Sequence, residues 1–277
     1  MRPNSHTIIH FFYVSDSSSA LTLLTTDTFW LSQAPFTPGS WFPGAGTPRL
    51  ATIAHFRLSA GTSTGTGGAE LLLFNTHLDH VSDPQRRLGA AMLLHRARHE
   101  ARVKPGVLIF VTGDFNRCGT YLNPLPYTFL LLKYGCSSAK GEDEGAYAVL
   151  TGAQEPPPVP DEFARRFPLP RGGDGPGSLL VMRDLRGAVP ARLRVGGEWA
   201  TFTGFERRKK DEECIDFVFG HSGGGWCVLR FYVFRMCGLI WRELNREAKN
   251  VFVFGNLTDD GMLSSDHRLV VADVDLS

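Results

Sequence analysis

Short apolar or β-branched runs recur along the chain, separated by clusters of Ser, Gly and Pro, and this pattern predicts β-strands. The predicted strands are residues 8–13, 21–24, 50–58, 71–76, 107–112, 200–205, 215–219, 251–254 and 269–274. The run VLIFVT at 107–112 is apolar or β-branched throughout, as expected of a central strand that is covered on both faces. Strands therefore dominate the predicted architecture.

Two segments have the character of helices. After Asp83-Pro84, apolar and aromatic-ring side chains recur at helical spacing from Leu88 to His95 while arginines take the other faces. We expect Asp83 to cap this helix and Pro84 to be its first residue. A second helix is predicted at 124–134, ending before Gly135. The length and composition of the chain fit one large α/β or β domain, or two small domains.

One segment, 153–177, is rich in proline, glycine and charged residues. Seven prolines in this span predict a long surface loop rather than a linker between domains. The pattern contains no internal repeat. We therefore expect residues 1–277 to form a single domain.

Composition narrows the class of protein. The chain is 43% hydrophobic and 21% charged, as in folded globular proteins, and its formal net charge of +1 provides no strong basic field for non-specific nucleic-acid binding. Five cysteines without a CxxC pair indicate neither a disulfide framework nor a zinc site. No signal peptide is recognisable, and the most apolar stretch, 228–241, is too short and too charged to span a membrane. We expect a soluble monomer in a compartment that the sequence does not define.

Polar side chains follow several of the predicted strands directly. The strings are Asn75-Thr76-His77-Leu78-Asp79-His80, Gly113-Asp114-Phe115-Asn116, Ile215-Asp216-Phe217 and Ser264-Ser265-Asp266-His267-Arg268. Each string alone is also typical of a turn or a cap, so the information lies in their joint occurrence. Carboxylate, amide and imidazole ligands without a thiol favour Mg²⁺ or Mn²⁺ over zinc, and such ions commonly serve phosphate chemistry.

In these strings the sequence resembles the endonuclease/exonuclease/phosphatase superfamily, which includes pancreatic deoxyribonuclease, abasic-site endonucleases, neutral sphingomyelinases and inositol-polyphosphate phosphatases. Further matching strings are Thr28-Phe29-Trp30-Leu31-Ser32, Pro48-Arg49, Thr201-Phe202-Thr203-Gly204-Phe205 and Asp259-Asp260-Gly261. These strings look most like those of a subgroup of uncharacterised microbial and fungal hydrolases. The resemblance implies a four-layer sandwich of two mainly antiparallel β-sheets flanked by helices.

The resemblance also implies roles for individual residues. His77 and His267 match imidazoles that contact the phosphate, and Asp114 and Asn116 match the pair that orients the attacking water and the phosphate, with Asp114 as the base. Asp216 matches a carboxylate that orients the first imidazole, His77. The expected metal ligands are Asp266, Asp114 and Asn116, and the expected substrate-binding residues are Asn75 and Arg117.

Two departures from the family pattern qualify this interpretation. The family opens with a strand ending in Asn and later carries a Glu that is its principal metal ligand, whereas no counterpart precedes Ile8. We therefore expect the chain to be truncated at its beginning, with the first strand section missing. Glu70, at the far end of a strand, and Glu100, on the charged side of the helix, are poor substitutes. The segment 226–250 is expected to be an insertion.

The implied activity is metal-dependent hydrolysis of a phosphodiester or phosphomonoester by in-line attack of water, with Mg²⁺ or Mn²⁺ as cofactor. Nucleic acid, nucleotide, inositol phosphate and lipid head group all remain open as phosphate-bearing substrates, because the fold does not choose among them. The alternative is a catalytically impaired fragment, or a non-catalytic relative that binds phosphate-bearing ligands. The missing Glu favours this alternative, and the intact polar strings favour the enzyme.

Overall fold

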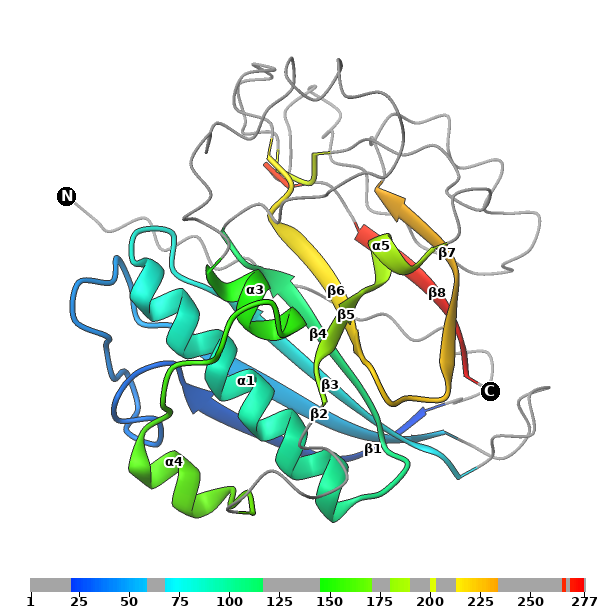
Figure 1. Cartoon of the computed structure of the whole chain (residues 1–277), viewed down its shortest axis with the longest axis horizontal. Coiled ribbons are helices and arrows are strands. Elements are labelled where there is room, and N and C mark those ends of the chain that lie inside the picture. Colours follow the sequence, from blue (N-terminus) through cyan, green and yellow to red (C-terminus); the bar gives the residue numbers. More distant parts are fainter. Residues whose placement is uncertain are drawn as a thin grey trace.

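The computed structural model describes residues 21–58, 68–116, 145–170, 180–189, 200–202, 213–233, 266–267 and 270–276. Six strands form one mixed sheet in the order β1-β2-β3-β4-β6-β5, and two more form a second sheet, β7-β8 (Figure 1). The strands are β1 (Leu21–Trp30), β2 (Leu50–Leu58), β3 (Glu70–His77), β4 (Leu108–Asp114), β5 (Met182–Asp184), β6 (Asp216–His221), β7 (Trp226–Val233) and β8 (Val270–Leu276). The helices are α1 (Asp83–Val103), α3 (Gly145–Thr151), α4 (Asp161–Arg166) and α5 (Leu185–Ala188).

Strand direction confirms the predicted fold class. Only β3 and β4 pair in parallel among the described strands, and the long helix α1 makes the crossover between them. Every other described pair is antiparallel. The protein is thus α/β with mainly antiparallel sheets.

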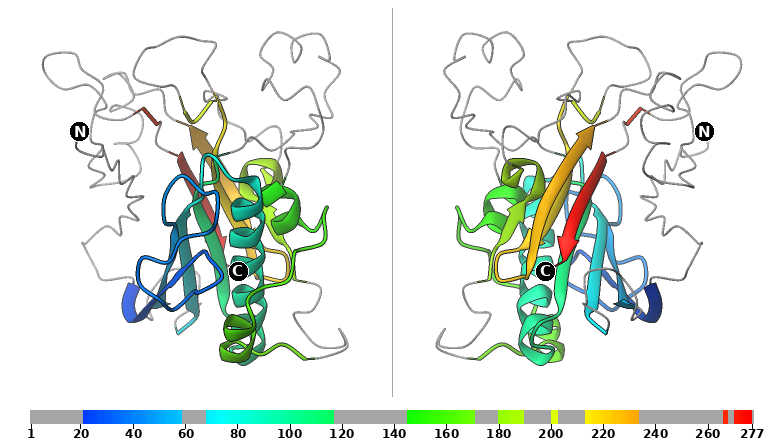
Figure 2. Two further views of the ribbon diagram at one scale, coloured as in Figure 1. Left: turned by 90° about the vertical axis from the view of Figure 1, so that its left-hand side faces the viewer. Right: turned by 90° about the vertical axis from the view of Figure 1, so that its right-hand side faces the viewer.

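The six-stranded sheet is covered on both faces, and alternating residues of β4 show how. Ile109 and Val111 belong to a core shared with α1, α3 and α4, while Leu108 and Phe110 belong to a core shared with α5, β7 and β8. Figures 1 and 2 show the three helices on one face of the sheet. The continuous apolar run in β4 is explained by this burial on both faces. A further outer layer of helices, which would complete four layers, stays a prediction.

Helix α1 follows the predicted apolar periodicity, but its start and its arginines differ from expectation. The N-cap is Ser82, whose hydroxyl accepts a hydrogen bond from the Gln85 N–H, so Asp83 is already the first helical residue. Arg86 is fully buried, although the spacing placed it on an outer face. Its guanidinium donates to the Asp79 carbonyl at 2.8 Å and pairs with Asp83, which offsets the cost of burial.

Several strand predictions are confirmed and others need correction. β2 has the predicted bounds, and β1 continues beyond residue 24 to Trp30. β5 was not predicted, because three residues are too few to show a pattern. Residues 226–233 lie in the segment 226–250, whose status as an insertion stays a prediction, and they form β7, which pairs with β8 over its whole length. The predicted strands 8–13 and 251–254 and the predicted helix 124–134 lie outside the described residues.

The proline-rich segment is only partly a surface loop. It contains α4, whose Phe163 is fully buried and packs against Phe29 of β1 with ring centroids 4.9 Å apart. The segment therefore contributes to the core between the sheet and helices α1, α3 and α4.

In the part of the chain that the structure describes, no helix is long and apolar enough to cross a membrane.

Candidate functional site

Three polar residues stand side by side across the centre of the large sheet. The register pairs His77, the last residue of β3, with Asp114, the last residue of β4, and pairs Asp114 with Asp216, the first residue of β6. Neighbours in register project from the same face of a sheet, so three strings that are distant in sequence form one row. The prediction that the strand ends converge on one rim of the sheet is confirmed for these residues.

Local backbone geometry at the end of β4 sets the position of Asp114. Gly113 has φ +145°, and a Cβ there would lie 1.8 Å from the Thr76 carbonyl oxygen, so only glycine lets β4 approach β3 this closely. Asn116 has φ +53°, a left-handed conformation that asparagine tolerates. Its N–H donates to the Asp114 carboxylate at 2.7 Å, and its side-chain amide donates to the Leu78 carbonyl at 2.7 Å. The chain after β4 therefore turns back and holds the Asp114 carboxylate in place.

The start of β6 is fixed by a buried hydroxyl. Thr201 Oγ1 accepts hydrogen bonds from the backbone N–H groups of Ile215 and Asp216, both at 3.0 Å. Thr201 is fully buried, so these bonds persist without competition from water. The neighbouring Phe202 forms a β-bridge with His267 and packs its ring edge against the imidazole. This contact brings the last polar string to the row.

His267 lies among three carboxylates. Its Nδ1 is 2.8 Å from Asp216 Oδ2, and its Nε2 is 3.7 Å from Asp114 Oδ2 and 4.0 Å from Asp266 Oδ1. Burial alone would lower the pKa of His267, but the hydrogen bond and charge of Asp216, with the charges of Asp114 and Asp266, raise it. The imidazolium form of His267 is therefore favoured in this site.

Asp114 is a buried carboxyl at the centre of the row. Its burial, reinforced by the negative charge of Asp216, raises its pKa to about 7, while His267, the Asn116 N–H and Arg49 act in the opposite direction. His77 Nε2 also lies 3.4 Å from Asp114 Oδ2. A carboxyl with a pKa near neutrality, flanked by two imidazoles, is suited to accepting a proton from water.

The donor set of the row fits a divalent cation. One ligand atom each from Asp114, Asp216 and His267 lie within 4.8 Å of one another, and all three residues are buried. Burial raises the pKa of Asp114 and the negative charge of Asp216 adds to this, so a cation between the two carboxylates would relieve their repulsion. Two carboxylates and one imidazole suit Mg²⁺ or Mn²⁺ better than a soft metal.

The other predicted site residues lie at different distances from the row. Asp266 lies at the edge of the row, with 27% of its side chain exposed. Asn116 directs its amide nitrogen to the Leu78 carbonyl, so its amide oxygen points away from Leu78. Asn75 lies within the sheet, 3.5 Å from Thr112 Oγ1. Arg117 lies outside the described residues, as do Ser264, Ser265 and Arg268.

Two expectations about individual carboxylates are wrong. Asp216 was expected to orient His77, but it hydrogen-bonds His267 instead, while His77 contacts Asp114. Glu100 was expected on the charged side of α1, but it is buried and bonded to Arg96 and Lys104. The second error arose because a paired charge on a helix has the same sequence pattern as a solvated one.

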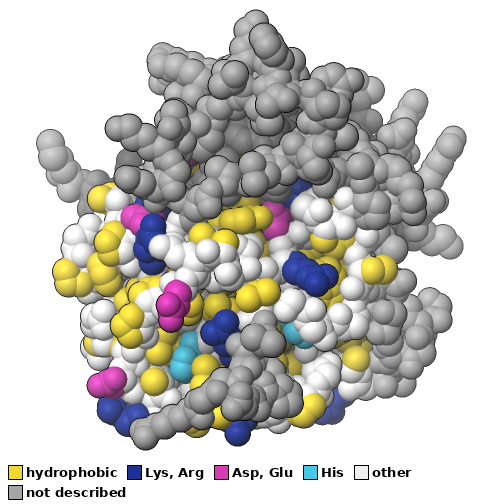
Figure 3. Space-filling model, in the orientation of Figure 1, with side chains coloured by type: hydrophobic (Ala, Val, Ile, Leu, Met, Phe, Trp, Pro, Cys, Tyr) yellow, Lys and Arg dark blue, Asp and Glu magenta, His cyan; other side chains and the backbone are white. Residues whose placement is uncertain are grey.

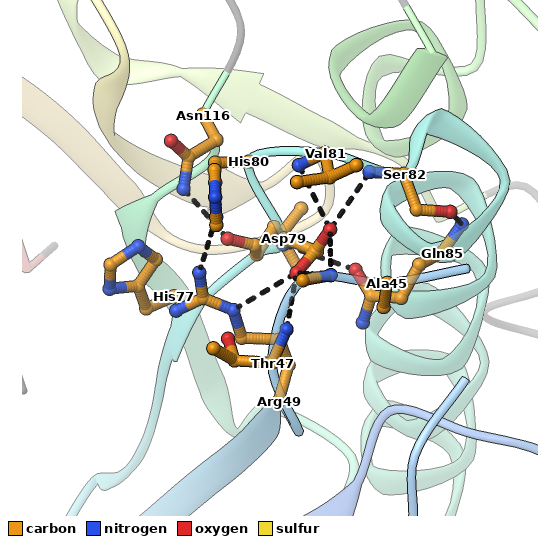
Figure 4. A network of polar contacts seen from close by, with 12 residues as sticks. Ala45, Thr47, Arg49, His77, Asp79, His80, Val81, Ser82, Gln85 and Asn116 are labelled. Carbon is orange, nitrogen blue, oxygen red and sulfur yellow. Dashed lines mark hydrogen bonds and ion pairs between the residues drawn. The ribbon is translucent and has the colours of Figure 1, made fainter. Parts of the chain in front are cut away.

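Asp79 anchors two loops of the site. It belongs to the polar string 75–80, but no role was predicted for it. Its side chain is fully buried and accepts hydrogen bonds from the backbone N–H groups of Gly46, Thr47, Val81 and Ser82 at 2.8–3.2 Å (Figure 4). Burial on its own would raise the pKa of Asp79, but these donors lower it below its ordinary value. Asp79 thus joins the loop before β2 to the loop before α1.

Arg49 is the second residue without a predicted role. Figure 4 shows its guanidinium beside Asp79, His77 and His80. Its Nε is 3.6 Å from Asp79 Oδ2 and its Nη2 is 3.3 Å from His80 Nδ1. The string Pro48-Arg49 was a signal that could have identified Arg49 as a site residue. An arginine in a sequence, however, does not by itself show whether it forms a buried ion pair or an exposed charge.

Comparison with known proteins agrees with the architecture. A solved structure described as an endonuclease/exonuclease/phosphatase from Bacteroides vulgatus has a TM-score of 0.58 at 22% identity, and the match covers 94% of this chain and 68% of that one. A mannosyl-6-phosphatase from Bacteroides thetaiotaomicron has a TM-score of 0.54 at 18% identity, and a functionally unknown conserved protein from Enterococcus faecalis has one of 0.53 at 20%, both with the same two coverages. The chain has the fold of endonuclease/exonuclease/phosphatase proteins.

Comparisons of the sequence itself yield no match. No family profile matches the chain, and no curated protein is significantly similar to it. The likeness to known proteins therefore lies in the fold.

Proposed function

We propose that the protein hydrolyses a phosphoester with the help of a divalent cation, at the row formed by His77, Asp114, Asp216 and His267. The observation that carries this proposal is the contact of Asp114 with both imidazoles, at 3.4 Å and 3.7 Å, in a row with a second carboxylate. A proton acceptor between two imidazoles matches the needs of water attack on phosphate. Neighbours in the structural comparison that are named as phosphatases support the same class of reaction.

In this proposal each side chain has a distinct task. Asp114 orients the attacking water and takes its proton. His77 and the imidazolium of His267 contact non-bridging phosphate oxygens and stabilise the charge that develops on them. Asp216 acts through His267, because its hydrogen bond fixes the ring orientation and favours the protonated form.

A cation would be held by Asp114, with Asp216, Asp266 or the Asn116 amide oxygen as further ligands. When bound, Mg²⁺ or Mn²⁺ supplies Lewis-acid stabilisation of phosphate charge. The glutamates that begin β3 and end α1 do not contribute, since Glu70 is bonded to His55 and Arg57, and Glu100 is bonded to Arg96 and Lys104. Asp114 and Asp216 are therefore the central candidates among the described carboxylates.

The second candidate function is phosphate-ligand binding without turnover. Asp216 Oδ2 is already engaged by His267 at 2.8 Å, so one of the few buried ligand oxygens is committed to a hydrogen bond. A weakly held cation would leave a site that binds phosphate but activates water poorly. This candidate keeps the same residues and differs only in rate.

The distribution of basic side chains on the described surface guides the choice of substrates to assay. Figure 3 shows Lys and Arg side chains scattered over the described part of one face rather than gathered into a patch. The described residues of this face therefore offer no extended basic track for a nucleic-acid backbone. A phosphomonoester, such as a sugar phosphate, is the first substrate to assay, with a bis-phosphoester beside it.

The test is steady-state hydrolysis of p-nitrophenyl phosphate, mannose 6-phosphate and bis(p-nitrophenyl) phosphate by the full chain, with Mg²⁺ and Mn²⁺ titrated. We expect cation-dependent turnover of at least one of the three that is lost in His77→Ala. Binding of inorganic phosphate without turnover of any substrate would favour the second candidate. Turnover that His77→Ala leaves unchanged would contradict the assignment of the site.

A further inference from the structure

We propose that Arg49 and His80 form an anion subsite that binds non-bridging oxygens of the substrate phosphate beside His77 and Asp114. The inference rests on the proposed function for the identity of its ligand. Its own test uses inorganic phosphate binding and does not need turnover.

The guanidinium of Arg49 lies at the row rather than at the free surface. Only 12% of its side chain is exposed, and Figure 4 shows the group directed to His77 and His80. Burial lowers the pKa of Arg49, whereas the charges of Asp79 and Asp114 raise it. The influence is mutual, since Arg49 in turn lowers the pKa of Asp114. An anion between these residues would therefore meet a cation that is already in place.

Most of the hydrogen-bonding capacity of Arg49 is not used by Asp79. The oxygens of Asp79 are occupied by four backbone N–H donors, and the ion pair to Arg49 Nε is long at 3.6 Å. Within the described residues the buried Nε–H has no hydrogen-bond acceptor. Asp79 thus balances the charge of Arg49. The two Nη groups, rather than the buried Nε, keep N–H donors for another acceptor. Phosphate oxygens match these donors in geometry and charge.

His80 completes the subsite from the other side. A guanidinium can only donate, so Nδ1 of His80 accepts from Arg49 Nη2 at 3.3 Å, and the proton of the neutral ring is then on Nε2. The ring is held against Gly46, where a Cβ would lie only 2.7 Å from its Cε1. His80 is exposed, so its Nε2–H is available to a ligand that enters from solvent.

The loops that carry both residues are fixed to each other. The Arg49 carbonyl accepts from the Leu31 N–H at 2.8 Å, and Asp79 bonds the backbone on both sides of the contact. A subsite with fixed donors binds an anion without the entropic cost of ordering two loops. The contacts of Asp79 therefore serve substrate binding as well as folding.

The test compares Arg49→Gln, Arg49→Lys and His80→Ala with wild type for binding of inorganic phosphate in the presence of Mg²⁺, by isothermal titration calorimetry. Arg57→Gln is the matched control, because Arg57 lies near the other end of β2 and pairs with Glu70 there. We expect the Kd for phosphate to rise at least about tenfold in Arg49→Gln, and less in Arg49→Lys and His80→Ala. Arg57→Gln should bind like wild type.

Circular dichroism and thermal unfolding show whether each variant is folded. If Arg49→Gln does not fold, His80→Ala still tests the inference, because it leaves the buried contacts of Asp79 intact. Phosphate binding by Arg49→Gln and His80→Ala that equals wild type, or a wild type that binds no phosphate, would overturn the inference. Arg49-dependent phosphate binding without turnover would sustain the inference and refute the proposed hydrolysis. Turnover with an unchanged KM in Arg49→Gln would sustain the proposed hydrolysis and refute the inference.

Discussion

Asp216 Oδ2 lies 2.8 Å from Nδ1 of His267, a residue 51 positions later in the chain, and both side chains are buried. This hydrogen bond is the link between the sheet and the last polar string. It fixes the imidazole so that Nε2 faces Asp114 at 3.7 Å. The chemistry proposed for His267 therefore depends on a carboxylate that never touches the substrate.

Replacing Asp216 by Asn should reduce kcat by about 10- to 100-fold, the usual effect of losing a partner that orients a ligand or catalytic imidazole. The pKa of His267 should fall because the largest upward influence on it is removed. The alkaline limb of the pH–rate profile should consequently move to lower pH. Asp161→Asn, at an exposed position in α4, is the control. An unaltered pH profile in Asp216→Asn would refute the positioning role.

The pKa of Asp114 makes a prediction about stability. Its folded-state pKa of about 7 is above the ordinary value of 3.8, so the ionised form is disfavoured in the folded protein. The destabilisation of the wild type begins as pH rises above 3.8 and is complete above about 7. Asp114→Asn should therefore gain stability relative to wild type between pH 5 and pH 8. Urea unfolding without divalent cation measures this, and a constant difference across that range would contradict it.

Divalent cations should act on the same carboxyl. Mg²⁺ should raise the unfolding midpoint of the wild type, because a ligand of the folded state stabilises it by about 2.7 kcal/mol at a hundred times its Kd. Asp114→Asn should lose most of this shift. Turnover should require Mg²⁺ or Mn²⁺, should be abolished by a chelator and should not be restored by zinc alone. Full turnover in excess chelator would exclude a metal-dependent mechanism.

Asp79→Asn should destabilise the protein by about 3 kcal/mol, since an amide cannot accept all four backbone donors and leaves Arg49 without its anion. The pKa of Asp79 is lowered on folding. Its contribution is therefore present above its unfolded-state pKa and is lost as pH falls through its folded-state pKa. The difference between wild type and variant should shrink in acid. Asp161→Asn, at an exposed position at the start of α4, is the control in urea unfolding.

Much of the site could be predicted because it is built on strand ends. His77 and Asp114 end their strands and Asp216 begins one, and strand pairing alone places the three in one row. The partner of Asp216 could not be predicted, because it depends on the β-bridge that places His267 beside Phe202. Arg49 and Asp79 are residue types that usually lie on the surface. Their burial and ion pair are visible only in the structure. β7 was not predicted as a strand because the apolar positions of its segment show no clear period.

The most direct test of the central claim is the rate of Mg²⁺-dependent phosphoester hydrolysis by Asp114→Asn, His267→Ala and the double variant, with His99→Ala as a control at a histidine outside the row. We expect each single variant to lose at least about a hundredfold in kcat/KM. The double variant should lose little more than the worse single one, because residues that act as a unit are not additive. A wild-type rate in either single variant, or losses that simply multiply in the double variant, would show that these residues do not form one catalytic centre.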